Sequence, residues 1–493
     1  MMFWTFVLLS SLVATVRPVL QRPTPVAART DLRAMAIVDS AIAQMGGLDA
    51  LRGIRTARYS MVTQWLSTNF TPRPFEDAPS YELNSDMRDY TTRTWRNVRR
   101  FAGAGWTEVT DLVIDTVAAR YSTTPLPSVA NAGSTVDNWT ALNVAYIDER
   151  RELFAFTPDR LVLLLRSAPD LRSRPDTVIG GIQEAAVSAT IDGFPTTAFF
   201  RRSDGFLTMA RYHADESNDF GLAPWGPMTV EVWYSQWRTD PASHVRTPAQ
   251  WDITRVGRPY KRMTVLSVAF NSTLPADSLV LSDSVRSEYL AHARHPMADL
   301  PLTNARLAPD RMIALFQAPG GPVAAVKVGK GWVLLEPGNL PLNAARAASW
   351  LASNDAGSKV IGAVMGTALP SGGASWVSRK GLPIYVTQPG AKGDSASLEN
   401  YSAPLSTLHV VARGEWIKFQ GAARDSLWVE PIDVPNLQGA LLLYSPSLRW
   451  AYSSAIGDPA QLRMVANRLR RRGWTVDVVG YPRAPEGVKP MRE

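Results

Sequence analysis

From about residue 55 to about residue 285 the chain is a series of short segments rich in valine, threonine and aromatic residues, separated by turn residues. This texture predicts β-strands, among them Trp106–Ala118 and Glu152–Phe156. Ser203-Asp204-Gly205 lies between two such segments and predicts a hairpin. One helix, Thr157–Ser167, interrupts the series, and its Thr-Pro-Asp start is typical of a helix with proline in its first turn. We therefore expect a large, curved antiparallel sheet packed on a helix.

A helix is expected ahead of this sheet. Asp31 is a suitable N-cap, and Gly46-Gly47 ends the segment. Apolar side chains recur between them at helical spacing, at Met35, Val38, Ile42 and Met45.

The pattern changes after residue 285. Residues 286–304 are interpreted as a connector, and from residue 305 onwards strands alternate with helices expected at Asn343–Ser353, near Ala374–Arg379 and at Asp458–Arg472. The stretch after strand Ile384–Thr387 is interpreted as a polar loop. Mixed elements in this order favour an α/β sandwich. The predicted organisation is α+β, with a β-rich domain at 31–285 and a second domain at 305–493.

Composition excludes several classes of site. The chain has no cysteine, which rules out disulfides, thiolate metal sites and cysteine nucleophiles. The net charge of +8 comes mainly from arginines spread along the sequence. A nucleic-acid partner is not expected, because such proteins concentrate their basic residues on one face among aromatic residues.

The first thirty residues suggest export. Residues 3–16 form an uncharged apolar run that suits a signal peptide, and residues 17–30 are rich in proline and are interpreted as a linker. No lysine or arginine precedes this run, so a retained membrane anchor is the alternative. We expect a periplasmic or membrane-anchored protein of the bacterial cell envelope.

The second domain resembles the metallo-β-lactamase superfamily. VKVGKGWVLLEPG at 326–338 is similar to the paired opening strands that end in an acidic residue, here Glu336. KVIGAVMGTALPSGG at 359–373 stands where the family has its histidine-rich loop and a Gly-Gly helix start, here Gly372-Gly373. NLQGALLLYSPSLRWAYSSA at 436–455 resembles the segment that carries the next histidine and the bridging aspartate.

All of the family's metal ligands are absent from this alignment. The former ligand positions are Met365, Thr367, Leu369, Pro370, Asn436, Ala455 and Tyr481. These side chains offer no imidazole or carboxylate, the groups that hold Zn²⁺ in such sites. A shifted alignment does not restore the site, because only one of the five histidines, His409, lies in this domain beyond its first strand. No metal and no cofactor are therefore expected.

A residual pocket is expected from Glu336, Ser371, Gly372 and Gly373. We interpret Glu336 as a carboxylate that stabilises a loop and Ser371 as a helix cap, because neither a nucleophile motif nor a His-Asp pair accompanies the serine. His409 is interpreted as a strand histidine, and His292 and His295 as part of the solvated connector.

The N-terminal region resembles LolA-like half-barrel domains, on the segments GGLDALRGIRTARYS and RTPAQWDITRVGRPYKRMTVLSVAFNSTLP and the β-rich stretch between them. That resemblance implies an apolar ligand such as a lipid or an acyl chain. The function that we expect is an exported, catalytically inactive pseudo-hydrolase that binds a protein partner or an apolar ligand, as an accessory subunit of an envelope complex. A lipid or lipoprotein carrier and a hydrolase with a relocated, metal-independent site remain open alternatives.

Overall fold

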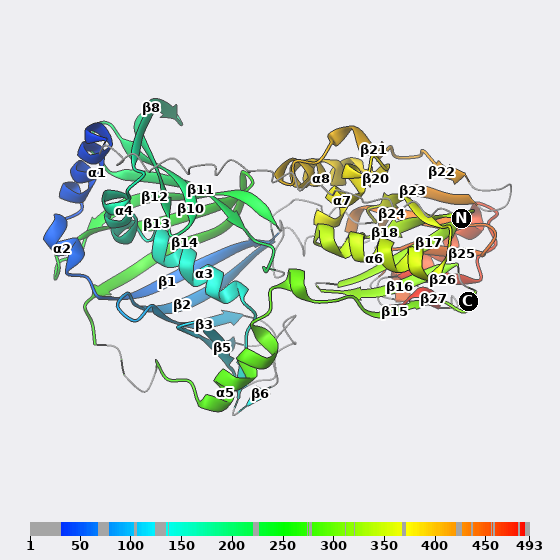
Figure 1. Cartoon of the computed structure of the whole chain (residues 1–493), viewed down its shortest axis with the longest axis horizontal. Coiled ribbons are helices and arrows are strands. Elements are labelled where there is room, and N and C mark those ends of the chain that lie inside the picture. The colour runs from blue at the N-terminus through cyan, green and yellow to red at the C-terminus, as the bar shows by residue number, and fades with distance from the viewer. Residues whose placement is uncertain are drawn as a thin grey trace, which may run out of the picture.

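The computed structural model of the chain combines large β-sheets with helices, which confirms the α+β class (Figure 1). The structure describes residues 31–67, 78–102, 106–123, 135–136, 138–219, 226–273, 275, 279–310, 312–319, 321–366, 371–420, 426–434, 437–454, 456, 459–481 and 484–488. Among these residues no helix has the length and apolar character needed to span a bilayer.

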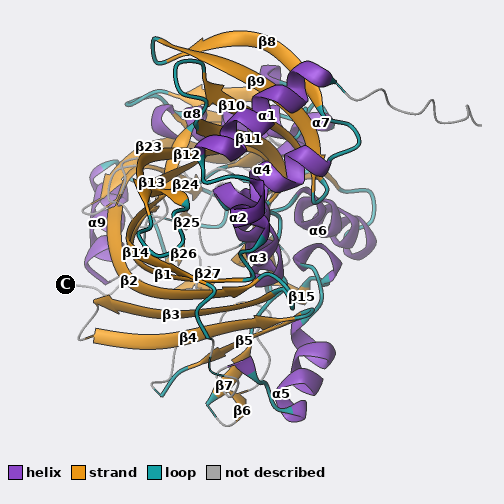
Figure 2. Cartoon of the chain, turned by 90° about the vertical axis from the view of Figure 1, so that its left-hand side faces the viewer, coloured by secondary structure: helices purple, strands orange, loops and turns teal. Residues whose placement is uncertain are grey.

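One sheet of fourteen strands dominates the N-terminal part, in the order β6-β7-β5-β4-β3-β2-β1-β14-β13-β12-β11-β10-β9-β8. Its strands are β1 (Thr56–Ser67), β2 (Ala78–Asp89), β3 (Thr94–Ala102), β4 (Trp106–Ile114), β5 (Val117–Tyr121), β6 (Thr135–Val136), β7 (Trp139–Ala141), β8 (Arg172–Ile179), β9 (Ile182–Ile191), β10 (Phe194–Arg201), β11 (Leu207–Asp215), β12 (Pro227–Thr239), β13 (Arg246–Arg255) and β14 (Arg258–Phe270). Its described strand pairs are antiparallel, and β1 and β14 join its two halves, with Ala57 opposite Phe270. Figure 2 shows the sheet curving around its helices.

The helices that pack on this sheet include α1 (Leu32–Gln44), α2 (Leu48–Arg52), α3 (Ala145–Phe156) and α4 (Pro158–Ser167). The predicted cap at Asp31 is confirmed, since its side chain accepts a hydrogen bond from the Ala34 amide. Pro158 opens α4 as predicted, but Thr157 makes no side-chain capping bond. Buried apolar residues of α1 and α4 share one core with the strands from β9 to β14.

The expectation of a strand at Glu152–Phe156 was wrong, because these residues end helix α3. The apolar run Leu153–Phe156 favoured a strand, but the eight residues before it begin the helix, and Thr157 ends α3 just before Pro158 begins α4. The single strand expected at Trp106–Ala118 is two strands, with a turn at Asp115 where φ is positive.

The region expected as a connector is largely helical. It contains α5 (Asp283–Glu288), the π-helix η2 (Tyr289–Ala293) and the 3₁₀-helix η3 (Met297–Asp299). Val285, Tyr289 and Ala293 pack into a core with strands β4, β5 and β7.

Two further sheets form the C-terminal part. The seven-stranded sheet contains β15 (Thr303–Leu307), β16 (Ile313–Ala318), β17 (Gly321–Val328), β18 (Gly331–Leu335), β19 (Lys359–Val364), β20 (Ile384–Thr387) and β21 (Leu408–Val411). The six-stranded sheet contains β22 (Ile417–Gln420), β23 (Ser426–Val434), β24 (Leu437–Ser445), β25 (Trp450–Ser453), β26 (Val478–Tyr481) and β27 (Ala484–Val488).

These sheets and their helices make four layers. One apolar core, including Val333 and Leu443, fills the space between the sheets. A second core packs α6 (Pro341–Asn354), α7 (Gly372–Arg379) and α8 (Gln388–Asn400) on the seven-stranded sheet. A third packs α9 (Pro459–Arg471) on the six-stranded sheet. The 3₁₀-helix η4 (Leu405–Thr407) leads from α8 into β21.

Helix α8 stands where a polar loop was expected. Its sequence, QPGAKGDSASLEN, lacks an apolar stripe, which explains the error. The helix begins at the Thr387 N-cap, whose hydroxyl accepts from the Gly390 amide at 3.2 Å, and it buries small residues such as Gly393 and Ser397. Close packing of small side chains replaces the usual apolar face.

Candidate functional site

The carboxyl ends of several strands meet at one end of the C-terminal layers. Glu336 follows β18, Gly366 follows β19 and Ser454 follows β25. A Cβ atom built on Gly366 would lie 2.5 Å from Glu336 Oε1 and 2.1 Å from Ser454 Oγ, so both side chains press against this glycine. In sheets with parallel strands, ligands bind outside the carboxyl ends of the strands. We call Glu336, Gly366, Asp394 and Ser454 the mouth, and it is the candidate site.

Glu336 has a strained backbone. Its φ is +51°, which is uncommon for a residue with a side chain, and its amide donates to the Val364 carbonyl at 3.1 Å. Strain of this kind costs about 1–3 kcal/mol and persists where the surrounding structure fixes the conformation. The neighbouring strand β19 therefore holds the Glu336 carboxylate in the mouth, where the sequence predicted an acidic residue.

Asp394 is the acidic residue that sequence reasoning missed. It lies on α8 and is fully buried, and neither carboxylate oxygen has a hydrogen-bond partner among the described residues. Burial raises the pKa of Asp394 well above its usual value, and the negative charge of Glu336 adds to that rise. The backbone amide of Ser371 is near enough to oppose the rise in pKa, although its geometry is not that of a hydrogen bond. The carboxyl group is accordingly held in its protonated form over a wider pH range than an exposed aspartate.

Ser454 completes the mouth. Its hydroxyl is buried and has no hydrogen-bond partner within the described part of the chain. Burial raises the pKa of the nearby Tyr452, and Glu336 raises it further, which places that phenol within the electrostatic influence of the same carboxylate. No sequence motif marks Ser454, but it adjoins Ala455, the position that the family resemblance assigned to the bridging aspartate.

The predicted helix start at Ser371 has a different role from the one expected. Ser371 occupies the N-cap of α7, yet its side chain makes no capping bond and donates instead to the Gly338 carbonyl. The amides of Gly372 and Gly373 donate to Asn339 and Gly338. A Cβ on Gly373 would lie only 2.2 Å from the Pro337 carbonyl oxygen. These residues anchor α7 to the loop after Glu336, and the two glycine amides are not available to an anion.

The other former ligand positions divide into two groups. Met365 is fully buried in the core beneath α6 to α8, and the backbone of Tyr481 ends β26. The remaining positions, Thr367, Leu369, Pro370, Asn436 and Ala455, lie outside the described residues.

The donors of the mouth do not fit a zinc site. Within the described residues no group of three His, Cys, Asp or Glu side chains could hold a metal ion. All five histidines are described and lie on other elements: His213 on β11, His244 between β12 and β13, His292 and His295 in the connector, and His409 on β21, stacked on Tyr385. Two carboxyl groups and a hydroxyl remain, without the imidazoles that Zn²⁺ hydrolases use.

The N-terminal sheet touches the helix that carries Asp394. Tyr401 caps α8 at its carboxyl end, and a Cβ on Gly226 would lie 1.9 Å from its hydroxyl oxygen. Burial raises the pKa of Tyr401, and Asp215 of β11 contributes to that rise. Gly226, which precedes β12, thus lies against the carboxyl end of α8, on the side of the C-terminal layers that faces the large sheet (Figure 1).

A row of charged side chains occupies the helix-facing side of strands β2 to β5. The pairing register places these residues on the same side of the sheet as the core residue Tyr59. The charged row consists of Glu82, Asp86, Arg88, Arg99, Asp111 and Arg120.

The row is internally paired. Arg88 Nε lies 2.6 Å from Asp86, and Arg88 Nη1 donates to the Thr157 hydroxyl between α3 and α4. Asp111 forms ion pairs with two arginines: Arg99 Nε lies 2.8 Å from Asp111 Oδ2, and Arg120 Nε lies 2.5 Å from Asp111 Oδ1. Burial by itself would raise the pKa of Asp111, but the two arginines hold that pKa below its usual value. This part of the concave side is therefore filled by ion pairs.

No model of a known protein family matches the chain, and no curated protein matches its sequence. Similar solved structures include an outer membrane lipoprotein-sorting protein domain from Vibrio parahaemolyticus, at 8% identity and a TM-score of 0.29, covering 50% of this chain and 96% of that one. A LolA-superfamily protein from Nitrosomonas europaea is 6% identical, with a TM-score of 0.30, and the match covers 50% of this chain and 97% of that protein.

Metallo-β-lactamases are also among them. FIM-1 from Pseudomonas aeruginosa is 13% identical, with a TM-score of 0.28, and the match covers 37% of this chain and 88% of that enzyme. Both kinds of domain that the sequence resembles thus recur among the similar solved structures. At these identities and TM-scores they say nothing about what this chain binds or catalyses.

Proposed function

We propose that this chain is a non-catalytic envelope protein, built from a LolA-like half-barrel and a degenerate metallo-β-lactamase sandwich, that acts by binding a partner protein. The observation that carries the proposal is the mouth. The family resemblance assigns the former metal site to this end of the strands, and the described donors of the mouth are two carboxyl groups and one serine hydroxyl. Metal-dependent hydrolysis needs ligands that leave a metal-bound water to act as nucleophile, and this donor set does not supply them.

The charged row weighs against the carrier alternative. A pocket for an acyl chain requires apolar side chains on the concave side of the sheet. Part of this side on strands β2 to β5 instead carries arginine and aspartate side chains, held to one another and to Thr157, next to apolar residues such as Trp95. Opening this side to a lipid would expose buried charges to hydrocarbon, which is strongly unfavourable.

The hydrolase alternative rests on the contact of Ser454 and Glu336 against Gly366. A serine beside a carboxylate is a possible nucleophile and base, but a carboxylate is a weak base for a serine hydroxyl, and no imidazole lies at the mouth. We therefore place this alternative second.

The test is a metal analysis of the purified chain together with a panel of ester, β-lactam and phosphodiester substrates. We expect zinc far below one equivalent and no turnover above buffer. One equivalent of zinc together with turnover would contradict the proposal. Turnover that survives chelation and disappears in Ser454→Ala, but not in the matched surface variant Ser447→Ala, would establish the relocated hydrolase instead.

The partner role and the envelope location need their own measurement. Recovery of the chain from native membranes in a stable particle with other subunits is the expected result. An organic extract of the purified chain that contains stoichiometric lipid would favour the carrier.

A further inference from the structure

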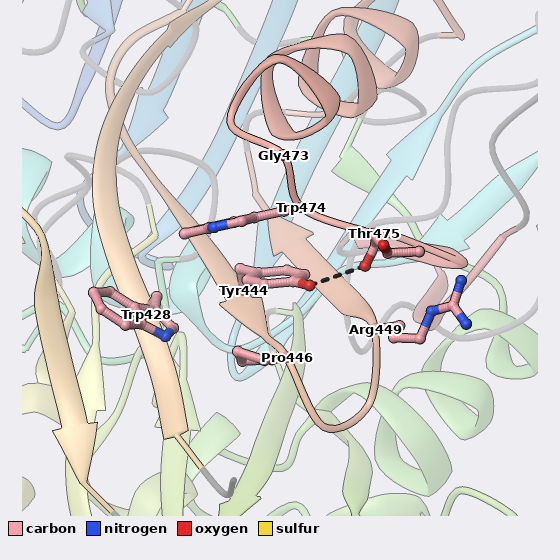
Figure 3. Close-up of a pocket in the computed structure, with 7 residues that line it drawn as sticks. All are labelled: Trp428, Tyr444, Pro446, Arg449, Gly473, Trp474 and Thr475. Atoms are coloured by element: carbon pink, nitrogen blue, oxygen red, sulfur yellow. Dashed lines mark hydrogen bonds between the residues drawn. The ribbon is translucent and has the colours of Figure 1, made fainter.

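A hollow of about 550 Å³ lies at the opposite end of the six-stranded sheet from the mouth. Pro446 and Arg449 come from the turn between β24 and β25, and Trp474 and Thr475 lie between α9 and β26 (Figure 3). Strand β25 begins here and leads to Ser454 of the mouth, and β26 runs parallel to it. Trp428, Tyr444 and Gly473 complete the lining, and we call this site the tryptophan hollow. Its volume is within the roughly 300–1,000 Å³ of small-molecule sites.

The aromatic wall of the hollow is held in place by its own contacts. Trp474 stacks on Tyr444 with ring centroids 4.2 Å apart, and Trp416 packs edge-on against Trp474 at 4.6 Å. The Tyr444 hydroxyl donates to the Thr475 carbonyl at 2.9 Å, the dashed line of Figure 3. Because these rings are fixed before a ligand arrives, binding loses little side-chain entropy.

The surroundings of the hollow are cationic. Lys418 Nζ lies 5.2 Å from the centre of the Trp428 ring, and the Arg472 guanidinium lies 4.8 Å from that of Trp416. The buried Glu430 carboxylate is shared by Arg468 and Arg472, so one negative charge meets two positive ones. Arg449 stands at the rim, half exposed and paired with Asp477 at 2.8 Å. Charge complementarity at this site favours an anion.

We propose that the tryptophan hollow binds an acidic carbohydrate, with a sugar ring against the tryptophans and its carboxylate on Arg449. A pyranose ring has an apolar C–H face that packs on an aromatic ring and hydroxyl groups that hydrogen-bond at its edge, where Thr475 is exposed. Arginine pairs with carboxylates through two parallel hydrogen bonds. This site is independent of the mouth and of the function proposed for it.

Two other ligand classes fit the hollow less well. A flat nucleobase would need to slide between parallel rings, but Trp474 and Tyr444 already touch at 4.2 Å. Attachment to a lipid surface would need apolar side chains that protrude from the protein. Trp428 and Trp474 are instead half-buried, and Tyr444 is 5% exposed.

The experiment titrates the full chain with trigalacturonate, with neutral maltotriose of the same length, and with vesicles that contain phosphatidylglycerol, by calorimetry and tryptophan fluorescence. We expect binding of trigalacturonate that weakens with salt, and at least tenfold weaker binding of maltotriose. Vesicle binding in place of trigalacturonate binding would overturn the proposal, as would equal affinity for the two sugars.

Two variants test the residues. Arg449→Asn keeps the positive φ of 48°, which asparagine tolerates, and should weaken trigalacturonate binding at least tenfold. Trp428→Ala should weaken both the affinity and the fluorescence change. Arg100→Ala, on the large sheet, removes the same charge elsewhere and should leave binding unchanged. Unchanged affinity in Arg449→Asn would refute the assignment even if Trp428→Ala failed to fold.

Discussion

The charged row of the large sheet and the mouth of the C-terminal layers both bury carboxyl groups, but they do so in opposite ways. Asp111 is 1% exposed and lies between two arginines, which hold its pKa below the usual value. Asp394 is equally buried without a partner among the described residues, and burial raises its pKa, with a further contribution from the charge of Glu336. Buried polar groups in proteins are normally paired. The row therefore acts as structure, whereas the mouth keeps the perturbed ionisation that is common in functional sites.

The largest expected effect comes from breaking the row at Arg88. Its guanidinium is fully buried, pairs with Asp86 and lies 4.7 Å from the centre of the Tyr59 ring. Arg88→Met would leave Asp86 buried with the Trp95 indole as its one side-chain donor among the described residues, and it should lower the free energy of unfolding by about 3–5 kcal/mol. Urea denaturation measures the change.

The double variant Arg88→Met/Asp86→Leu is the control for this effect. Replacing a whole buried ion pair by apolar residues is often neutral, so most of the lost stability should return. If the double variant were as unstable as the single one, packing around Arg88, and not its charge, would be the cause.

A smaller effect of opposite sign is expected at the mouth. Asp394→Asn keeps the shape of the side chain but cannot ionise, so it removes the cost of protonating the buried carboxyl group at neutral pH. It should raise the free energy of unfolding there by about 1.4 kcal/mol for each unit by which the native pKa exceeds the unfolded value. The native pKa is raised, so the folded chain holds a proton that the unfolded chain has released, and wild-type stability falls as pH rises from about 4 towards the native pKa.

Stability measured from pH 4 to pH 8 checks this prediction. The gain in Asp394→Asn should grow with pH across that range. Asp111 has the opposite sign, because its lowered native pKa gives stability that is present above a pH of about 4 and is lost as pH falls through the native pKa. A gain in Asp394→Asn that does not change with pH would show that the carboxyl group does not titrate with folding.

Elements with local signals could be predicted from the sequence. Helices α1 and α4 were expected because Asp31 and the Thr157-Pro158 pair are cap signals that need no distant partner. Helix α8 was missed because it buries glycine and serine, so hydrophobic periodicity gave no indication of it. Asp394 was missed together with its helix.

Contacts between distant segments could not be predicted in this way. Strand β1 pairs with β14 some two hundred residues later, and no local pattern specifies that pairing. Glu336 was predicted from the family resemblance, but its meeting with Ser454 depends on Gly366 bringing the two sheets together. The charged row also could not be predicted from the sequence. Asp86 and Arg88 are two residues apart along β2, the spacing that charged residues have on the exposed face of a strand.

The smallest expected effect is at an ion pair outside the row. Arg100 Nε lies 3.3 Å from Glu108, and both side chains are more than half exposed. Arg100→Ala should change the free energy of unfolding by no more than about 1 kcal/mol, because water and salt screen an exposed pair. The same urea titration as for Arg88→Met, at low and at high salt, measures it. Arg99, the preceding residue, sits in the row, so Arg99→Ala compares the two environments one position apart. Equal losses of unfolding free energy in Arg99→Ala and Arg100→Ala would mean that burial does not determine how much a charge pair stabilises this sheet. The contrast between the charged row and the mouth would then not hold.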